Sequence, residues 1–304
     1  LRRPGIATLP LAPLSQTETT TLLESLGPQG RSDNPSLRWA ERIWTASGGN
    51  PFVIVELVKS LEQQTGPMAT PDALSLPQGV RELVGARLDR VSDRGRALAA
   101  VACVIGRNFE FELLQRASGL GEGEAAAGVE ELVRRRVLRA IGEQLAFVHD
   151  RVREVVYAEL LPFRRKLLHR QVAETVESLH ATDLAPHVAV LGQHYREGEV
   201  WDKAFDYFRQ AGSHAYQHAA YRASAAYYTQ ALSVFDQIPR DKRRSEDAID
   251  VRLEFRLPLL YVPGSEGITA LLTEAAQMAE AAGDDPRLAR VLAFEAQHHW
   301  GSAE

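Results

Sequence analysis

The lysines of this sequence decide what phosphate chemistry the chain is able to perform. Only four occur among the 304 residues, and none of them follows a glycine; they are Lys59, Lys166, Lys203 and Lys242. The phosphate loop G-x-x-x-x-G-K-[ST] needs a lysine directly after its second glycine, so this sequence does not contain it. The motifs H-E-x-x-H and G-x-S-x-G are also missing, and the single cysteine, Cys103, excludes cysteine-based zinc sites. We therefore expect no catalysis by this chain itself.

Two histidines have a spacing that could serve a metal. His214 and His218 are four residues apart in a stretch with helical periodicity, which would place both on one helix face. No third ligand is evident from the sequence, and a pair of histidines on a repeat helix is more often solvated or packed than bound to a metal. We therefore predict no metal site.

The stretch SGGNPFVIVELVKSL, residues 47–61, combines a helix end with a helix start. Gly48 and Gly49 allow the left-handed backbone with which many helices end. Asn50 is a good N-cap, and Pro51 suits the first helical position because the N–H that it lacks would have no partner there. Local structure alone therefore explains these residues. A binding role for them needs a further argument.

The composition is that of a soluble globular protein. Apolar residues make up 45% and charged residues 25% of the chain, and the net charge of −5 gives no general attraction to nucleic acid or to an anionic membrane. No apolar run approaches the ~18 residues of a membrane span. One cysteine cannot form an intramolecular disulfide, which fits a reducing compartment. We interpret the chain as an internal fragment of a larger cytoplasmic protein.

The first part of the chain is predicted to be helical. Ser15 and Glu18 have the spacing of a capping box, which predicts a helix to about Leu26. A second helix is expected to carry Ala40, Ile43 and Trp44 and to end at the glycine pair. The segment after it is rich in Pro, Gly and Thr and is predicted to be a linker.

A small β-hairpin is predicted in the middle of the chain. Helices are expected over Val80–Arg90, Arg94–Ile105, Glu110–Ala117 and Glu122–Arg134. Two short alternating runs around Gly142 and Glu143 then read as a hairpin, and a helix with Val152, Val155 and Val156 on one face follows. Helices followed by a small hairpin describe a winged helix.

The remainder of the chain reads as helix and contains a repeat signature. The spacing L-G-x2-Y…A-x3-F of a tetratricopeptide repeat is kept by Leu191, Gly192, Tyr195, Ala204 and Phe208. Val188 stands where that motif prefers Trp. A related piece covers Ala225–Pro239, and a further helical hairpin begins near Leu271. The unit spacing is irregular, so we predict degenerate repeats whose stacked helices offer a surface to partners.

In this order, the pieces resemble the signal-transduction ATPases with numerous domains, the STAND class. The stretch at residues 47–61 resembles the lid of that class, and residues 138–177 resemble the end of its winged helix and the passage into its repeats. The resemblance is closest to the bacterial ATPase modules joined to LuxR-type regulators, kinases or cyclases. It implies a mainly α fold: a helical lid, a winged-helix domain with a small β-hairpin, and an α-solenoid of degenerate tetratricopeptide-like repeats. The implied domains are residues 1–14, a remnant of the nucleotide-binding core; 15–62, the lid; 63–79, the linker; 80–161, the winged helix; and 162–304, the repeats.

The resemblance also implies nucleotide-binding residues, which would act together with a core upstream of this chain. In the STAND class, the proline of the Gly-x-Pro at the lid junction contacts the adenine, which nominates Pro51 together with Asn50. The winged helix of related switches has a Met-His-Asp motif whose histidine contacts the β-phosphate, which nominates His149 and Asp150, with Val148 in place of Met. A histidine between a strand and a helix start would meet free amides that favour phosphate. The implied ligands are ATP or ADP with Mg²⁺ in the parent protein, and none is expected in this chain alone.

Two other interpretations stay open. A DNA-binding winged helix with a helical dimerisation arm, as in a transcriptional regulator, would use the basic run at residues 134–136; however, residues 80–161 contain 13 Arg and 13 Asp or Glu, so the domain is neutral. A plain repeat adaptor would leave Pro51 and His149 pointing away from each other. The partners that we expect are the upstream nucleotide-binding core, a protein or small-molecule effector on the repeats, and another copy of the chain. We expect neither a membrane nor nucleic acid as a partner.

Overall fold

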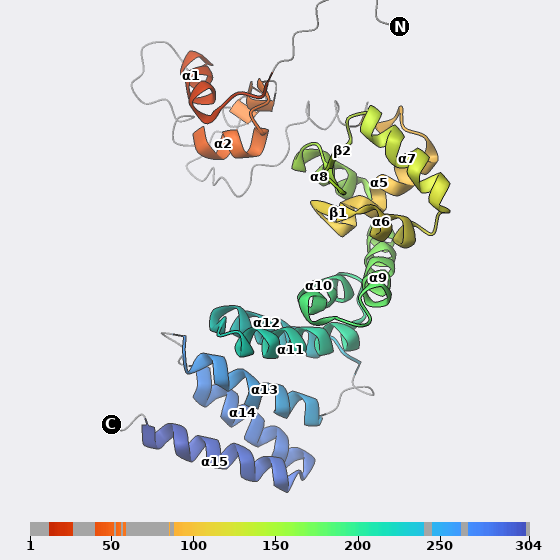
Figure 1. The fold of residues 1–304 in the computed structure, drawn as a ribbon. Helices are drawn as coiled ribbons and strands as arrows, with labels where there is room; N and C mark the ends of the chain where they lie inside the picture. Colours follow the sequence, from red (N-terminus) through yellow and green to blue (C-terminus); the bar gives the residue numbers. More distant parts are fainter. Residues whose placement is uncertain are drawn as a thin grey trace, which may run out of the picture. The chain divides into compact units, whose positions relative to one another are not determined.

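The fold is mainly helical and contains one small sheet, as the sequence predicts. The computed structural model describes residues 12–26, 40–51, 53–55, 57–58, 85, 88–239, 245–262 and 267–301 (Figure 1). The chain divides into two compact units: Leu1–Phe109 with Glu122–Glu159, and Glu110–Gly121 with Leu160–Glu304. The predicted linker over residues 63–79 and most of the predicted core remnant lie outside the described residues. Among the described helices, none has both the length and the apolar character required to cross a bilayer.

The first unit begins with a pair of packed helices, α1 (Gln16–Leu26) and α2 (Ala40–Ser47). The capping box is confirmed, because the Ser15 N–H donates to the Glu18 carboxylate at 2.8 Å and the Glu18 N–H donates to the Ser15 hydroxyl at 3.2 Å. A small core closes the pair, with the described part of the helix that starts at Pro51 contributing to it. Its buried members are Leu23, Ile43, Ile54, Leu57 and Val58.

The rest of the first unit surrounds a three-stranded sheet. The hairpin predicted around Gly142 is confirmed: β2 (Leu138–Ile141) pairs antiparallel with β3 (Gln144–Phe147). A third strand, β1 (Asn108–Glu110), was not predicted from the sequence and completes a sheet of order β1-β3-β2. Helices α5 (Asp93–Ile105), α7 (Glu122–Arg134) and α8 (Asp150–Glu159) accompany the sheet, and α5 packs on both α7 and α8.

The second unit begins with the packing of α6 (Phe111–Ser118) against α9 (Pro162–Leu179). The prediction grouped α6 with the winged helix over residues 80–161, whereas its contacts place it in the second unit. A short 3₁₀ turn, η3 (Ala185–His187), then leads to α10 (Val188–Glu197) and α11 (Trp201–Gln217), which carry the repeat signature.

The repeat signature has a direct packing explanation. Leu191, Tyr195 and Phe208 are buried side chains of the α10–α11 interface. A Cβ atom at Gly192 would lie only 2.8 Å from the Phe208 ring, so this glycine is what lets the two helices approach so closely. The tetratricopeptide spacing therefore marks one close-packed helical hairpin.

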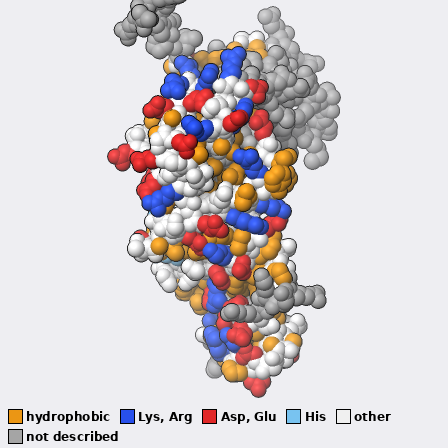
Figure 2. All heavy atoms as spheres, turned by 90° about the vertical axis from the view of Figure 1, so that its right-hand side faces the viewer, with side chains coloured by type: hydrophobic (Ala, Val, Ile, Leu, Met, Phe, Trp, Pro, Cys, Tyr) orange, Lys and Arg blue, Asp and Glu red, His pale blue; other side chains and the backbone are white. Residues whose placement is uncertain are grey.

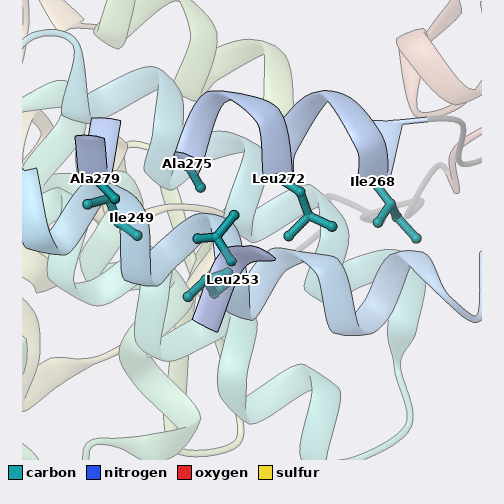
Figure 3. Close-up of a cluster of buried hydrophobic side chains, with 7 residues drawn as sticks. Ile249, Leu253, Ile268, Leu272, Ala275 and Ala279 are labelled. Atoms are coloured by element: carbon teal, nitrogen blue, oxygen red, sulfur yellow. The ribbon is translucent and has the colours of Figure 1, made fainter. Parts of the chain in front are cut away.

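Further helices continue the stack, and each packs on the next. They are α12 (Tyr221–Phe235), α13 (Ser245–Leu259), α14 (Gly267–Ala282) and α15 (Asp285–Gly301). Side chains from α13, α14 and α15 form a buried cluster (Figure 3), which consists of Ile249, Leu253, Ile268, Leu272, Ala275, Ala279 and Val291. The cluster combines branched side chains with the small residues Ala275 and Ala279, which suit close helix contact. The helical hairpin predicted from Leu271 onward is confirmed as α14 and α15, joined at Gly283 in a left-handed conformation.

Candidate functional site

The glycine pair after α2 forms a turn that no other residue could make in the same way. Gly48 and Gly49 both have positive φ angles, 58° and 72°, which confirms the predicted left-handed helix end. A Cβ atom at Gly49 would lie 2.2 Å from the carbonyl oxygen of Leu14, so a side chain is excluded there on steric grounds as well. The Leu14 N–H donates to the Gly49 carbonyl at 2.8 Å, and the Trp44 indole N–H donates to the Leu14 carbonyl at 3.0 Å.

Asn50 and Pro51 begin the next helix, as predicted. The Asn50 carbonyl accepts a hydrogen bond from the Ile54 N–H at 3.0 Å, which is the first bond of that helix. Pro51 is the first helical residue and is exposed. An exposed proline ring at a helix start is open to a ligand, but the same position also suits its structural role.

His149 lies between a strand and a helix, as the sequence analysis expected. Strand β3 ends at Phe147 and α8 begins at Asp150, and the His149 carbonyl accepts from the Val152 N–H at 3.0 Å. His149 is half-buried. The imidazole packs on the glycine turn after α2: a Cβ atom at Gly48 would lie 3.1 Å from the His149 Nδ1. Two motifs separated by about a hundred residues in sequence therefore meet within the first unit.

This meeting point is a cavity of about 200 Å³. It is lined on one side by the end of α2 and on the other by the β2–β3 hairpin and the first turn of α8; the lining residues are Thr45, Ser47, Gly48, Arg107, Asn108, Arg139, Ala146, Phe147, Val148, His149, Asp150 and Arg151. The cavity therefore brings together two of the four predicted site residues, His149 and Asp150. Pro51 and Asn50 are not among its lining residues, although they directly follow Gly49.

The charges of the cavity are unequal, because three arginines face one carboxylate. Asp150 accepts hydrogen bonds from the Arg107 guanidinium in a two-point ion pair, one of them at 3.0 Å to Nε. Arg151 pairs with Glu154 at 2.7 Å. In the part of the chain that the structure describes, the exposed Arg139 guanidinium has no hydrogen-bond or ion-pair partner. The excess of positive charge makes the cavity suited to an anion.

The first turn of α8 adds donors to these charges. The leading N–H groups of a helix lack carbonyl partners within it, and the aligned peptide dipoles favour an anion there. Arginine binds phosphate through several parallel N–H groups, which a single lysine cannot do. The cavity thus has the donors and the charge for a phosphate group. Sequence reasoning missed Arg107 and Arg139, because neither lies in a recognisable motif.

A second cavity in the first unit, of about 460 Å³, contains the basic residues at the end of α7. Two of its three arginines are paired with acids: Arg94 pairs with Glu124 at 3.2 Å, and Arg134 pairs with Glu130 at 3.5 Å. The Glu131 carboxylate accepts from the Ser92 hydroxyl and N–H at the start of α5, and these hydrogen bonds lower the pKa of Glu131. An anion of the protein itself therefore already occupies this helix start.

One face of the molecule gives no support to the DNA-binding interpretation. On the face shown in Figure 2, Lys and Arg side chains are interspersed with Asp and Glu, with hydrophobic side chains between them. A DNA-binding domain normally concentrates basic residues on one face.

Within the described residues, no three His, Cys, Asp or Glu side chains are grouped as a metal site requires. His214 and His218 lie with their ring centroids 4.3 Å apart, and a His218 ring nitrogen lies 2.8 Å from the His214 carbonyl oxygen.

Comparisons with known proteins place the chain only coarsely. No family model matches the sequence, and no curated protein matches it. A solved structure that aligns with the chain is a signal transduction ATPase with numerous domains (STAND) protein with a tetratricopeptide repeat sensor, from Pyrococcus horikoshii. The identity is 10% and the TM-score 0.29, over 92% of this chain and 50% of that one. The chain thus spans half the length of that protein, and a similarity this low carries no argument about function.

Proposed function

We propose that this chain is the regulatory and scaffold part of a nucleotide-switched signalling ATPase of the STAND type. In this proposal, the phosphate-binding core lies upstream in the parent protein. The lid, up to residue 62, and the winged helix, residues 80–161, close on the ATP or ADP that the core holds. The repeats bind a partner or inducer. The proposal starts from the order of motifs along the sequence, because no single motif in the chain is decisive.

The observation that carries the proposal is the cavity at which Gly48 and His149 meet. An interaction between a lid turn and a strand end so far away in sequence is what a shared nucleotide site requires. The excess of arginine in the cavity supports a phosphate ligand. Pockets for drug-sized molecules are typically about 300–1,000 Å³, so a cavity of about 200 Å³ suits a phosphate chain and leaves the base outside. The base would then lie beyond the glycine turn, where Pro51 is exposed.

The role of each residue follows from its position. The Arg139 guanidinium and the first-turn amides of α8 would hold phosphate oxygens. His149 would donate one further hydrogen bond from its ring, and Asp150 would orient Arg107 through their ion pair. The chain itself would hydrolyse nothing, since it contains no phosphate loop or other recognisable catalytic constellation.

A switch needs a difference between two states. A residue shifts a two-state equilibrium only by the free energy with which it prefers one state. If His149 contacts ADP when the winged helix is closed, then His149→Ala removes one hydrogen bond, worth ~1–3 kcal/mol. That loss weakens ADP roughly ten- to hundredfold. ATP, bound with the winged helix swung away, loses little.

The experiment uses the parent protein with its upstream coding sequence. ADP and ATP are titrated against the wild-type protein, His149→Ala and a matched control, His218→Ala, whose histidine is exposed on the repeats. We expect His149→Ala to weaken ADP selectively and His218→Ala to change neither nucleotide. Equal weakening of both nucleotides with a lower melting temperature would show a packing histidine and end the sensor hypothesis. An upstream sequence without a phosphate loop would end the whole proposal.

A further inference from the structure

Three tyrosines, two from helices and one from the turn after a third helix, gather at one end of the repeat hairpins. Tyr216 lies near the end of α11, Tyr221 begins α12, and Tyr261 follows α13. Tyr221 and Tyr261 are stacked with their centroids 4.2 Å apart and their planes at 15°. The Tyr216 ring lies 5.6 Å from that of Tyr221 and 6.4 Å from that of Tyr261. We call this group, with Leu260 and Arg256, the tyrosine patch.

The patch is open to solvent. Leu260 and Tyr261 are 55% and 56% exposed. A single exposed apolar side chain is ordinary, but two adjacent large ones that continue a cluster of rings form a surface. Tyrosine and arginine are enriched in protein–protein interfaces, because they cover a large area and still offer polar groups. This surface has the composition of a binding site for a protein segment.

Arg256 gives the patch an unbalanced charge. Its Nε is buried and has no hydrogen-bond partner among the described residues. Its guanidinium stacks on the Phe294 ring at 3.6 Å from the centroid. Burial lowers the pKa of Arg256, and the nearby Tyr216 phenol opposes that change.

The neighbouring arginines have ion pairs with carboxylates, which Arg256 lacks among the described residues. Arg252, one turn earlier on α13, pairs with Glu274 at 3.0 Å, and Arg209 pairs with Glu254 at 2.5 Å. Arg287 pairs with Asp250 at 2.9 Å. No ion pair of Arg256 is found in the described part of the chain. Burial destabilises the charged form of Arg256, and no acid is paired with it among the described residues. A carboxylate supplied by a partner would therefore stabilise this cation.

We infer that the tyrosine patch binds a peptide segment of a protein partner in which a carboxylate stands next to an aromatic or branched aliphatic side chain. The carboxylate pairs with Arg256, and the apolar side chain packs on Leu260 and Tyr261. Charge complementarity favours this occupant over an apolar or basic segment. The inference concerns the repeats alone and does not depend on nucleotide binding.

The test is a selection of peptides by the chain. A library of random 12-residue peptides is panned on the wild-type chain, with counter-selection on Arg256→Leu. Selected peptides are synthesised with a fluorophore, and their dissociation constants are measured by fluorescence polarisation. Four variants are compared: Arg256→Leu, Arg256→Lys, Tyr261→Ala, and the control Arg116→Leu, which removes a charge from an exposed ion pair on α6. Melting curves confirm that each variant is folded.

We expect selected peptides that combine Asp or Glu with an aromatic or aliphatic neighbour. Arg256→Leu and Tyr261→Ala should each weaken them about tenfold or more, and Arg116→Leu less than about twofold. Arg256→Lys keeps the charge but lacks the planar guanidinium, so its loss of affinity should lie between the losses of Arg256→Leu and Arg116→Leu. Replacement of the peptide's acid by its amide should reproduce the loss seen with Arg256→Leu.

Three results would overturn the inference. One is a selection that yields no peptide above the counter-selection. Another is a set of peptides without acidic residues that Tyr261→Ala weakens and Arg256→Leu does not, because the patch would then be purely apolar. A dimer in sedimentation experiments that Tyr261→Ala dissociates would identify a second copy of the chain as the occupant.

Discussion

The cavity of the first unit and the helical stack of the second use the same residue, arginine, in opposite ways. In the stack, several arginines are bound to carboxylates of neighbouring helices, as in Arg209 with Glu254 and Arg287 with Asp250, and Arg256 is an exception among the described residues. The cavity is lined by three arginines: Arg107 pairs with Asp150, Arg151 pairs with Glu154, and Arg139 has no partner among the described residues. A paired arginine holds neighbouring helices together. Removing it would leave the partner carboxylate without its counter-charge in a partly buried position. An arginine without an acid is available to a ligand.

The same difference extends to what stabilises each region. The stack depends on buried interhelical contacts such as that of Gly192 with Phe208. The cavity walls bring a glycine turn together with a strand end and a helix start, and their exposed Arg139 has no partner among the described residues. We therefore expect substitutions in the stack to change the free energy of unfolding, and substitutions in the cavity to change ligand response.

The largest effect is expected in the α10–α11 interface. Phe208 is 1% exposed, and Phe208→Ala should lower the free energy of unfolding by ~3–5 kcal/mol, because it removes a ring and leaves a cavity. Phe163 is 69% exposed, so Phe163→Ala serves as a control with an effect below ~0.5 kcal/mol. Denaturant titrations of the second unit's transition measure both. Similar values for the two variants would contradict the packing role of the repeat signature.

A smaller effect is expected for the charge network of Glu177. Its carboxylate accepts from Lys203 at 2.8 Å and from the hydroxyls of Tyr195 and Tyr207, each at 2.5 Å. Glu177→Gln should cost ~1.5–3 kcal/mol, because it weakens several hydrogen bonds to a charged acceptor.

The exposed pair of Lys166 with Glu199 is the matched control for that network. Glu199→Gln should change the free energy of unfolding by less than ~1 kcal/mol. Denaturant titrations compare the two variants. An equal and small effect of both would mean that the paired charges of the stack do not hold its helices.

A pH-dependent loss is expected from a buried histidine pair. The Nδ1 atoms of His169 and His194 are 2.9 Å apart, and both residues are buried. Burial, assisted by the neighbouring His169, lowers the pKa of His194 from 6.5 to about 3; burial also lowers the pKa of His169, which Glu197 opposes.

A lowered pKa means that the folded state resists the proton that the unfolded state accepts. Full stability is then present above pH 6.5 and declines below it, toward the folded-state pKa. Between pH 7 and pH 5, His194 alone should cost about 2 kcal/mol. Unfolding at both pH values measures the loss, and the double variant His169→Leu/His194→Leu should reduce the slope while His218→Leu leaves it. An unchanged slope in the double variant would assign the loss to other groups.

The smallest effect on stability is expected in the cavity. Arg139→Gln should change the free energy of unfolding by less than ~0.5 kcal/mol, because this exposed side chain has no partner to lose among the residues that the structure describes. Inorganic pyrophosphate should raise the melting temperature of the wild-type chain and not that of Arg139→Gln. Arg116→Gln is the control that keeps the response to pyrophosphate. A loss of stability without a loss of response would reverse the comparison between the two units.

The features that the sequence predicted well are those with a local cause. The capping box at Ser15, the left-handed Gly48 and Gly49, and the hairpin at Gly142 each depend on residues a few positions apart. The repeat signature was also recognisable, because its spacing repeats a known packing geometry. Strand β1 was missed, because three residues give too short a pattern and the strand forms only by pairing within the sheet.

The composition of the cavity could be predicted only in part. His149 and Asp150 were found through a resemblance between motifs. Arg107 reaches Asp150 across 43 residues of sequence, and no local rule announces such a contact. The pairing of His169 with His194 is equally non-local. A role for Pro51 stays a prediction.

Through the hydrogen bond from the Leu14 N–H to the Gly49 carbonyl, we expect the glycine turn to respond to mechanical load on the chain before α1. This bond links the main chain just before α1 directly to the turn whose preceding residue, Gly48, forms a wall of the cavity. The Trp44 indole N–H donates to the carbonyl of the same residue, Leu14, so the segment before α1 is anchored at two points. A pull on the chain before Leu14 would therefore be transmitted through Gly49 to its neighbour Gly48, which lines the cavity. Tension on this segment would then displace Gly48 and change the width of the cavity.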